Sequence, residues 1–105
     1  MLNGDHSLDG QRTVVVGAGI LGTVHALFAL QRGADVVHLE RDVVPHGATV
    51  RNFGLIWVSG RASGAELALA LRSRELWQEI GERVPGVGFR ANGSLSLVNT
   101  DAEMQ

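Results

Sequence analysis

Cysteine is absent from the 105 residues of this chain, and its absence excludes several kinds of site. Without a thiol there is no disulfide framework, iron–sulfur cluster, cysteine-ligated zinc or thiol nucleophile. The histidines are dispersed: His6, His25, His38 and His46 share no metal-ligand spacing. No Ser/His/Asp arrangement suggests hydrolase chemistry. We therefore predict no metal site, interpret His25 and His38 as core or surface residues, and leave the catalytic residues unassigned.

An excess of charge of one sign is also absent. Nine basic residues against eleven acidic ones give a net charge of −2 and a pI near 6.0. That balance leaves no electrostatic footprint for nucleic acid or an anionic membrane. Residues 1–11 are polar and have no cationic start before an apolar stretch, which predicts a flexible leader rather than a signal peptide. We expect a cytoplasmic protein without a nucleic-acid partner.

Long apolar runs are limited to one uncharged stretch, residues 13–30. It contains three glycines, and His25 lies within it, which argues against a membrane span. The stretch divides better into a strand over 13–16 and a helix over about 20–32. A second apolar run, 35–40, follows after a short connection. Strand, glycine turn, helix and strand in this order predict a βαβ unit, so the expected fold class is α/β.

The remaining chain carries further local signals. An irregular loop is expected first, then a strand, the longest helix and a last strand, over residues 41–52, 53–58, 63–84 and 94–98. Pro85 and Gly86 end the long helix. The pattern Thr100-x-x-Glu103 is a capping box, which predicts that another helix begins there.

Glycine is abundant, with 14 residues, roughly twice the average usage. Gly17-Ala18-Gly19-Ile20-Leu21-Gly22 fits the pattern G-x-G-x-x-G between the first strand and the first helix. Gly17 allows a tight turn, Gly19 has no side chain to block a pyrophosphate, and Gly22 lets helix and strand pack closely. The helix N-terminus then presents its free amides to the phosphates. The motif in this context predicts a dinucleotide site.

Glu40 lies at the end of the second strand, 23 residues after Gly17, where the dinucleotide motif has an acidic residue. Its carboxylate would accept hydrogen bonds from a ribose diol and repel a 2′-phosphate. Arg41 either lays its guanidinium over an adenine or stands exposed in solvent. The alternative interpretation of the whole pattern is a glycine-rich turn without a ligand. The motif does not separate FAD from NAD, because both use this turn.

With this turn, Glu40-Arg41 and the loop Gly47-Ala48-Thr49-Val50-Arg51-Asn52-Phe53-Gly54, the chain resembles the FAD-dependent oxidoreductases of the D-amino-acid oxidase superfamily. The glycine oxidase and sarcosine oxidase branches are the most similar in appearance. Residues 50–54 with Trp57 resemble a subgroup linked to bacterial aminophosphonate breakdown. Family members follow the ribose-binding acid with a Gly-Ala-Ser/Thr loop, a helix like residues 67–77 and a strand like residues 92–97.

The resemblance implies a Rossmann-like FAD-binding domain. It also implies oxidation of the C–N bond of a small amine or amino acid by hydride transfer to flavin, giving an imine that hydrolyses. Arg51 and Asn52 would lie near the isoalloxazine, or else cap a helix end or face solvent. His46 either carries the flavin covalently, as in some relatives, or is an ordinary loop residue. The expected FAD-binding residues are Gly17, Ala18, Gly19, Ile20, Leu21, Gly22, Glu40, Arg41, Gly47, Ala48, Thr49, Arg51 and Asn52.

The chain departs from this family in its length, because members continue through a substrate domain and then return to the nucleotide domain. We expect residues 12–84 to be the N-terminal part of the FAD-binding domain, and residues 85–105 the truncated beginning of the substrate domain. Two alternatives stay open: a non-catalytic truncated or decayed copy that at most binds the ADP half of a dinucleotide or a partner chain through its unfinished sheet edge, and an NAD(P)-binding module. The second is disfavoured, because the glycine-rich loop 47–54 suits flavin placement better than the helix of a further Rossmann repeat would.

Overall fold

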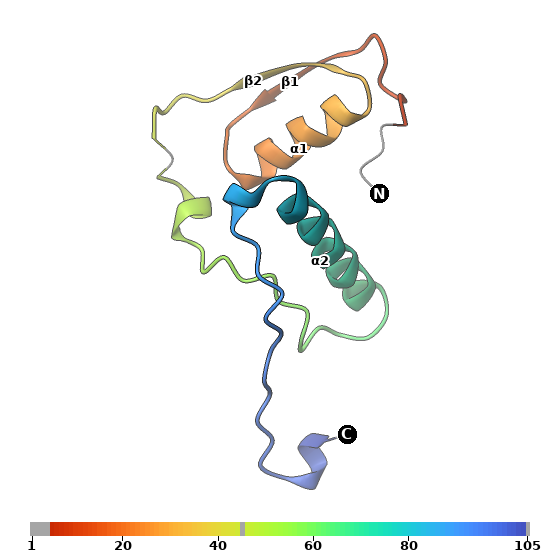
Figure 1. Cartoon of the computed structure of the whole chain (residues 1–105), viewed down its shortest axis with the longest axis vertical. Coiled ribbons are helices and arrows are strands. Elements are labelled where there is room, and N and C mark those ends of the chain that lie inside the picture. The colour runs from red at the N-terminus through yellow and green to blue at the C-terminus, as the bar shows by residue number, and fades with distance from the viewer. Residues whose placement is uncertain (1–4, 45, 105) are drawn as a thin grey trace. The chain divides into compact units, whose positions relative to one another are not determined.

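The computed structural model of the chain describes residues 5–44 and 46–104 (Figure 1). The chain forms two compact units, residues 1–55 and 56–105, and each is described by itself. The first unit contains β1 (Arg12–Val16), α1 (Ile20–Gln31), β2 (Asp35–Leu39) and the short 3-10 helix η1 (Ala48–Arg51). The second contains α2 (Ala65–Arg83) and the 3-10 helices η2 (Pro85–Val87) and η3 (Asp101–Met104). The expected division of the family's two domains at residue 84 stays a prediction.

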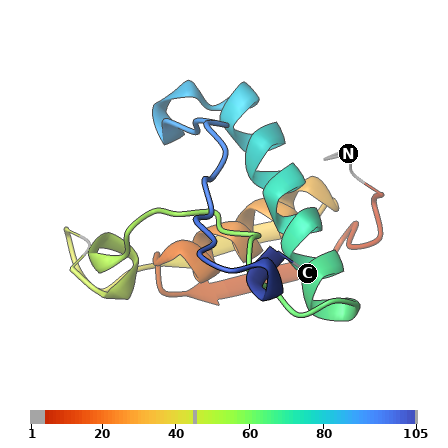
Figure 2. The same cartoon turned by 90° about the horizontal axis from the view of Figure 1, so that it is seen from below.

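The first unit is a βαβ arrangement. β1 and β2 pair in parallel, with Val15 opposite His38, and α1 supplies the crossover that parallel neighbours need. Figures 1 and 2 show α1 lying along one face of the two strands. The helix ends at Gln31, and Gly33 just beyond it adopts φ +87°, a left-handed conformation that glycine takes without a Cβ penalty. The predicted strand, turn, helix and strand are therefore confirmed.

Small residues make the core of the first unit. Ala26 and Ala29 of α1 are buried, as is Ala34 just before β2. Alanines let a helix approach a sheet closely, although each buries little apolar area. On the other face of the strands the aliphatic side chains remain in contact with water, and Val16 is 80% exposed. Strand pairing and close backbone packing therefore hold this unit together more than large buried side chains do.

The segment before β1 lies against the end of α1. The amide of Leu8 donates to the carbonyl of Arg32 over 2.9 Å, and the amide of Asp35 donates to the carbonyl of Gln11 over 2.9 Å. Residues 1–4 of the expected leader lie outside the described residues. For the remainder, these bonds show where the backbone lies, and the flexibility of the leader stays a prediction.

The second unit is built around α2. The predicted helix over 63–84 is confirmed with bounds Ala65–Arg83, and Pro85 follows where the helix has ended. Gly81 faces the side chain of Phe89, because a Cβ at Gly81 would stand 2.5 Å from the Cβ of Phe89. The expected helix start at Thr100 appears as η3, which begins at Asp101, while the side chain of Glu103 lies outside the described residues. Within the described part of the chain, neither α1 nor α2 is long and apolar enough to cross a membrane.

The strands expected at 53–58 and 94–98 are wrong. In the described residues both segments are irregular, and β1 and β2 are the strands of the only sheet found there. A strand is defined by a hydrogen-bonded neighbour, and the apolar side chains here also lack cover: Phe53 is 92% exposed and Leu95 is 87% exposed. Apolar and aromatic composition alone suggested extended structure, but neither segment has a pairing partner.

Gly22 in the first turn of α1 provides a test of the close packing in the first unit. A Cβ at Gly22 would overlap the carbonyl oxygen of Gly17, which is backbone and has little room to move. We expect Gly22→Ala to lower the free energy of unfolding by about 1–3 kcal/mol, the usual cost of overpacking. Urea unfolding followed by circular dichroism measures this difference.

The matched control is Gly47→Ala, because a Cβ there meets no heavy atom within 4 Å and the backbone has φ −80°. This variant should unfold at nearly the urea concentration of the unmodified chain. Equal losses in both variants would contradict the packing argument at Gly22.

Candidate dinucleotide-binding site

The glycine motif forms the turn between β1 and α1. Gly17 adopts φ +103°, and its amide donates to the carbonyl of Leu39 over 2.7 Å, which extends the strand pairing by one bond. Gly19 precedes α1 in an extended conformation, and its carbonyl accepts from the amide of Thr23 over 2.9 Å. The amides of the first helical turn before Thr23 have no helical carbonyl to bond. The turn therefore places the positive end of α1 beside the end of β2.

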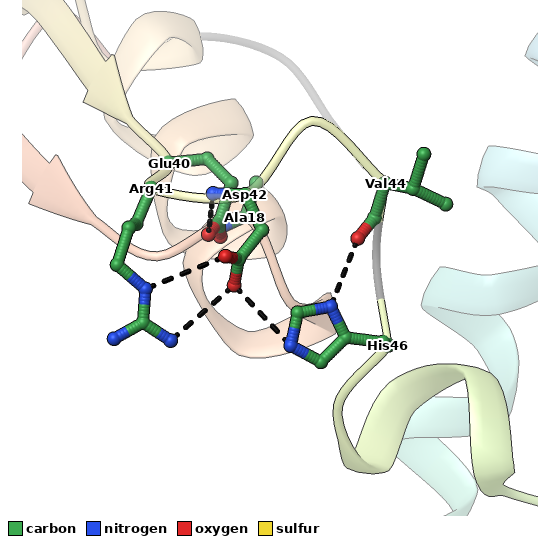
Figure 3. A network of polar contacts seen from close by, with 6 residues as sticks. All are labelled: Ala18, Glu40, Arg41, Asp42, Val44 and His46. Atoms are coloured by element: carbon green, nitrogen blue, oxygen red, sulfur yellow. Dashed lines mark hydrogen bonds and ion pairs between the residues drawn. The ribbon is translucent and has the colours of Figure 1, made fainter.

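Glu40 reaches back from the end of β2 to this turn (Figure 3). Its Oε2 accepts from the amide of Ala18 over 2.6 Å, and its Oε1 accepts from the amide of Asp42 over 3.0 Å. These two donors, Ala18 first, hold the pKa of Glu40 below its ordinary value of 4.5. A carboxylate has about four lone-pair positions, so both oxygens keep acceptor capacity for the hydroxyls of a ligand.

His38, interpreted from the sequence as a core or surface residue, also contacts the turn. Its Nε2 lies 2.9 Å from the carbonyl oxygen of Gly17. The signal that could have found it is strand register: residue 38 pairs with Val15, two positions before Gly17, and has the same parity as Glu40 on β2. The two side chains therefore leave β2 on the same side and reach the same turn.

In the loop after Glu40, the side chain of Asp42 contacts two neighbouring side chains (Figure 3). Its carboxylate lies 3.4 Å from the guanidinium of Arg41 and 3.4 Å from Nε2 of His46. The other ring nitrogen of His46 lies 3.2 Å from the carbonyl oxygen of Val44. Arg41 is thus paired with a neighbouring carboxylate while its side chain is 87% exposed. The expected roles of Arg41 over an adenine and of His46 at a flavin stay predictions.

The loop of residues 47–52 is brought to the turn at one point. Thr49 in η1 accepts a hydrogen bond through Oγ1 from the amide of Ile20, over 2.9 Å. The same hydroxyl lies 3.2 Å from where a Cβ of Gly19 would stand, so a side chain at Gly19 would make a tight contact and require the hydroxyl to shift. By contrast, Asn52 accepts from the amide of Gly54 over 3.0 Å, within its own loop, and Arg51 is exposed at the end of η1.

The arrangement fits the ADP part of a dinucleotide. The glycine turn adjoins the N-terminus of α1, and the hydroxyl of Thr49 accepts from the first amide of that helix. The ionised carboxylate of Glu40 lies at the end of β2. Helix N-termini with close backbone access bind phosphates, and a carboxylate in this place accepts from ribose hydroxyls. Of the expected site residues, the structure joins the turn, Glu40 and Thr49 directly. The individual ligand contacts of all the expected residues stay predictions.

The lowered pKa of Glu40 predicts acid sensitivity. A carboxyl whose pKa is lower in the folded chain contributes stability above its unfolded pKa and loses that contribution as the pH falls through the folded pKa. We expect Glu40→Gln to be less stable than the unmodified chain above pH 4.5, and the difference to vanish as the pH falls below the lowered pKa. Urea unfolding at a series of pH values measures it.

The control is Glu82→Gln on α2, whose carboxylate accepts from the side chain of Gln78 over 3.2 Å in the other unit. It should not reproduce the pH-dependent difference. A loss of stability in Glu40→Gln that is the same at all pH values would show that the charge of Glu40 does not contribute.

Comparison with known proteins gives one match that bears on this site. A family model described as FAD dependent oxidoreductase matches residues 12–105. No curated protein and no solved structure matched the chain significantly. The family match includes the glycine turn, Glu40 and the loop with Thr49, which the structure brings together. The chain therefore belongs to the FAD-dependent oxidoreductases of the D-amino-acid oxidase family, whose cofactor is FAD.

Proposed function

We propose that the first unit binds the ADP half of FAD. In this proposal the pyrophosphate lies against the turn of Gly17 to Gly22 at the start of α1, and Glu40 accepts from the ribose hydroxyls. The contact between Glu40 Oε2 and the amide of Ala18 carries the proposal, because it places an ionised carboxylate at the glycine turn. A carboxylate at that place favours a free ribose diol over a 2′-phosphate.

The path of the chain after β2 favours FAD over a nicotinamide dinucleotide. A second dinucleotide repeat would continue with a full helix, whereas here a loop leads to the four-residue η1. The Thr49 hydroxyl of η1 reaches the first amide of α1. In the proposal this loop, with Gly47 and Ala48, borders the pyrophosphate and leads toward the flavin, near Arg51 and Asn52.

For the whole protein we propose oxidation of the C–N bond of a small amine or amino acid. When bound, FAD would supply the acceptor for a hydride from the carbon next to nitrogen; the nitrogen would lose a proton, and the resulting imine would hydrolyse in water. The resemblance to glycine and sarcosine oxidases and to the aminophosphonate subgroup supports this substrate class. The proposal includes a substrate domain that begins near residue 85 and a cytoplasmic location. The role of the described residues is to bind and orient the nucleotide.

Gly19→Val tests nucleotide binding. We expect a loss of ADP affinity of roughly tenfold or more, because the added side chain enters the space that the turn shares with Thr49 and the pyrophosphate. Calorimetry with ADP and with FAD measures the affinities. The control is Gly86→Val in the second unit, where a Cβ meets no heavy atom within 4 Å. If the two variants bind ADP equally well, the turn does not hold the pyrophosphate.

A further arm of this titration compares ADP with its 2′-phosphorylated counterpart. Like charges brought together at a binding site repel each other, so ADP should bind at least roughly tenfold more tightly. Glu40→Gln should reduce that preference. Equal binding of the two nucleotides would place Glu40 away from the ribose.

The proposed reaction is tested on the product of the complete open reading frame, however far it extends, loaded with FAD. Under anaerobic conditions glycine, sarcosine or 2-aminoethylphosphonate should bleach the flavin absorbance, because hydride transfer reduces it. The matched control replaces each amine by the corresponding hydroxy compound. Bleaching by the hydroxy compounds alone would assign C–O oxidation instead and contradict the proposal.

A further inference from the structure

The peptide group between Gly17 and Ala18 has both its carbonyl oxygen and its amide in contact with side chains, those of His38 and Glu40. The carbonyl oxygen of Gly17 lies 2.9 Å from Nε2 of His38, and the amide of Ala18 donates to Glu40 over 2.6 Å. These two atoms belong to the same peptide, in which C=O and N–H point in opposite directions. The side chains of His38 in β2 and of Glu40 just after β2 therefore fix one peptide plane at the start of the glycine turn.

The direction of the bond from His38 follows from the chemistry of its partner. A carbonyl oxygen only accepts, so the contact requires a hydrogen on Nε2 of the ring. A neutral imidazole can carry its hydrogen on either nitrogen, and this geometry selects the Nε2–H form. The ring is therefore a donor aimed at the turn.

The contacts of this peptide matter because Gly17 by itself constrains its backbone weakly. Gly17 adopts φ +103°, and glycine populates several backbone regions at small cost, so contacts with His38, Glu40 and the closely packed Gly22 decide how the Gly17–Ala18 peptide is oriented. Turning this peptide over would also carry Ala18 toward positive φ, which a residue with a Cβ resists. A turned peptide would present its carbonyl oxygen to the carboxylate of Glu40 and withdraw the Ala18 amide. The position of the ribose-binding carboxylate thus depends on the orientation of this peptide.

We propose that His38 is a positioning residue of the nucleotide site. By donating from Nε2 to the Gly17 carbonyl, it holds the Gly17–Ala18 peptide with its amide directed at Glu40, and so keeps the turn ready for a nucleotide. This inference rests on the proposed binding of ADP at the turn. His38 contacts the turn and not the ligand.

Three substitutions at residue 38 separate the hydrogen bond from the packing of the ring. The amide nitrogen of glutamine is as many bonds from Cα as Nε2 of histidine, whereas that of asparagine matches only Nδ1. His38→Gln should therefore keep ADP affinity within about twofold of the unmodified chain, while His38→Phe and His38→Asn should each lose roughly 3- to 10-fold, the range for one hydrogen bond. Calorimetry with ADP measures all of these affinities.

The matched control is His25→Phe on α1. That histidine also contacts a backbone carbonyl through a ring nitrogen, Nδ1 to Leu21 at 2.7 Å, but the carbonyl belongs to its own helix. The same change of side chain there should leave ADP affinity within about twofold. A loss as large as that in His38→Phe would mean that any ring exchange weakens binding, and would overturn the inference.

A spectroscopic measurement on the unmodified chain does not depend on how the variants fold. In the neutral ring, ¹⁵N spectra should show the proton of His38 on Nε2. A proton on Nδ1, or equal ADP affinities for His38→Gln and His38→Phe, would overturn the role of His38. Failure of the unmodified chain to bind ADP would overturn the proposed function instead, and the ring spectrum would still decide whether the hydrogen bond exists.

Discussion

The hydrogen bond between the Glu40 carboxylate and the Ala18 amide is the contact on which the rest of the site depends. It joins the end of β2 to the turn that begins α1, because Glu40 lies one residue and Ala18 two residues beyond the last strand pair, Val16 with Leu39. A bond from a neutral amide to a charged oxygen is stronger than one between neutral groups, and it keeps the carboxyl ionised. The bond therefore fixes the position of the Glu40 carboxylate relative to the strand pair and to the start of α1.

This close arrangement of strands, turn and helix depends on small residues rather than on large side chains. Gly22 lets α1 stand against the Gly17 carbonyl, and Ala26 and Ala29 continue the close approach along the helix. Because these residues bury little apolar area, the helix is placed by backbone contacts rather than by a large core. The residues that would recognise a phosphate are the same ones that allow the helix to pack, so binding and folding place the same demand on the sequence here.

The parts of the fold that the sequence predicted are those in which local pattern and chain order agree. A β-branched run, three glycines, a helical stretch and a second apolar run give the βαβ unit, and parallel pairing then brings Glu40 to the turn. The pattern was insufficient at residues 53–58 and 94–98. There the side chains resemble those of strands, but extended structure depends on a partner that composition does not specify.

The site residues divide in the same way. Glu40 and His38 follow from strand register, although only the first was assigned, because an acid at a strand end is part of a known pattern and a histidine two residues earlier is not. Thr49 follows from no register: its contact with Ile20 spans 29 residues and depends on the path of an irregular loop. Its neighbour Asn52 instead bonds within that loop. A sequence motif can therefore place the glycine turn, while the loop residues that contact the turn depend on a backbone path that only the structure gives.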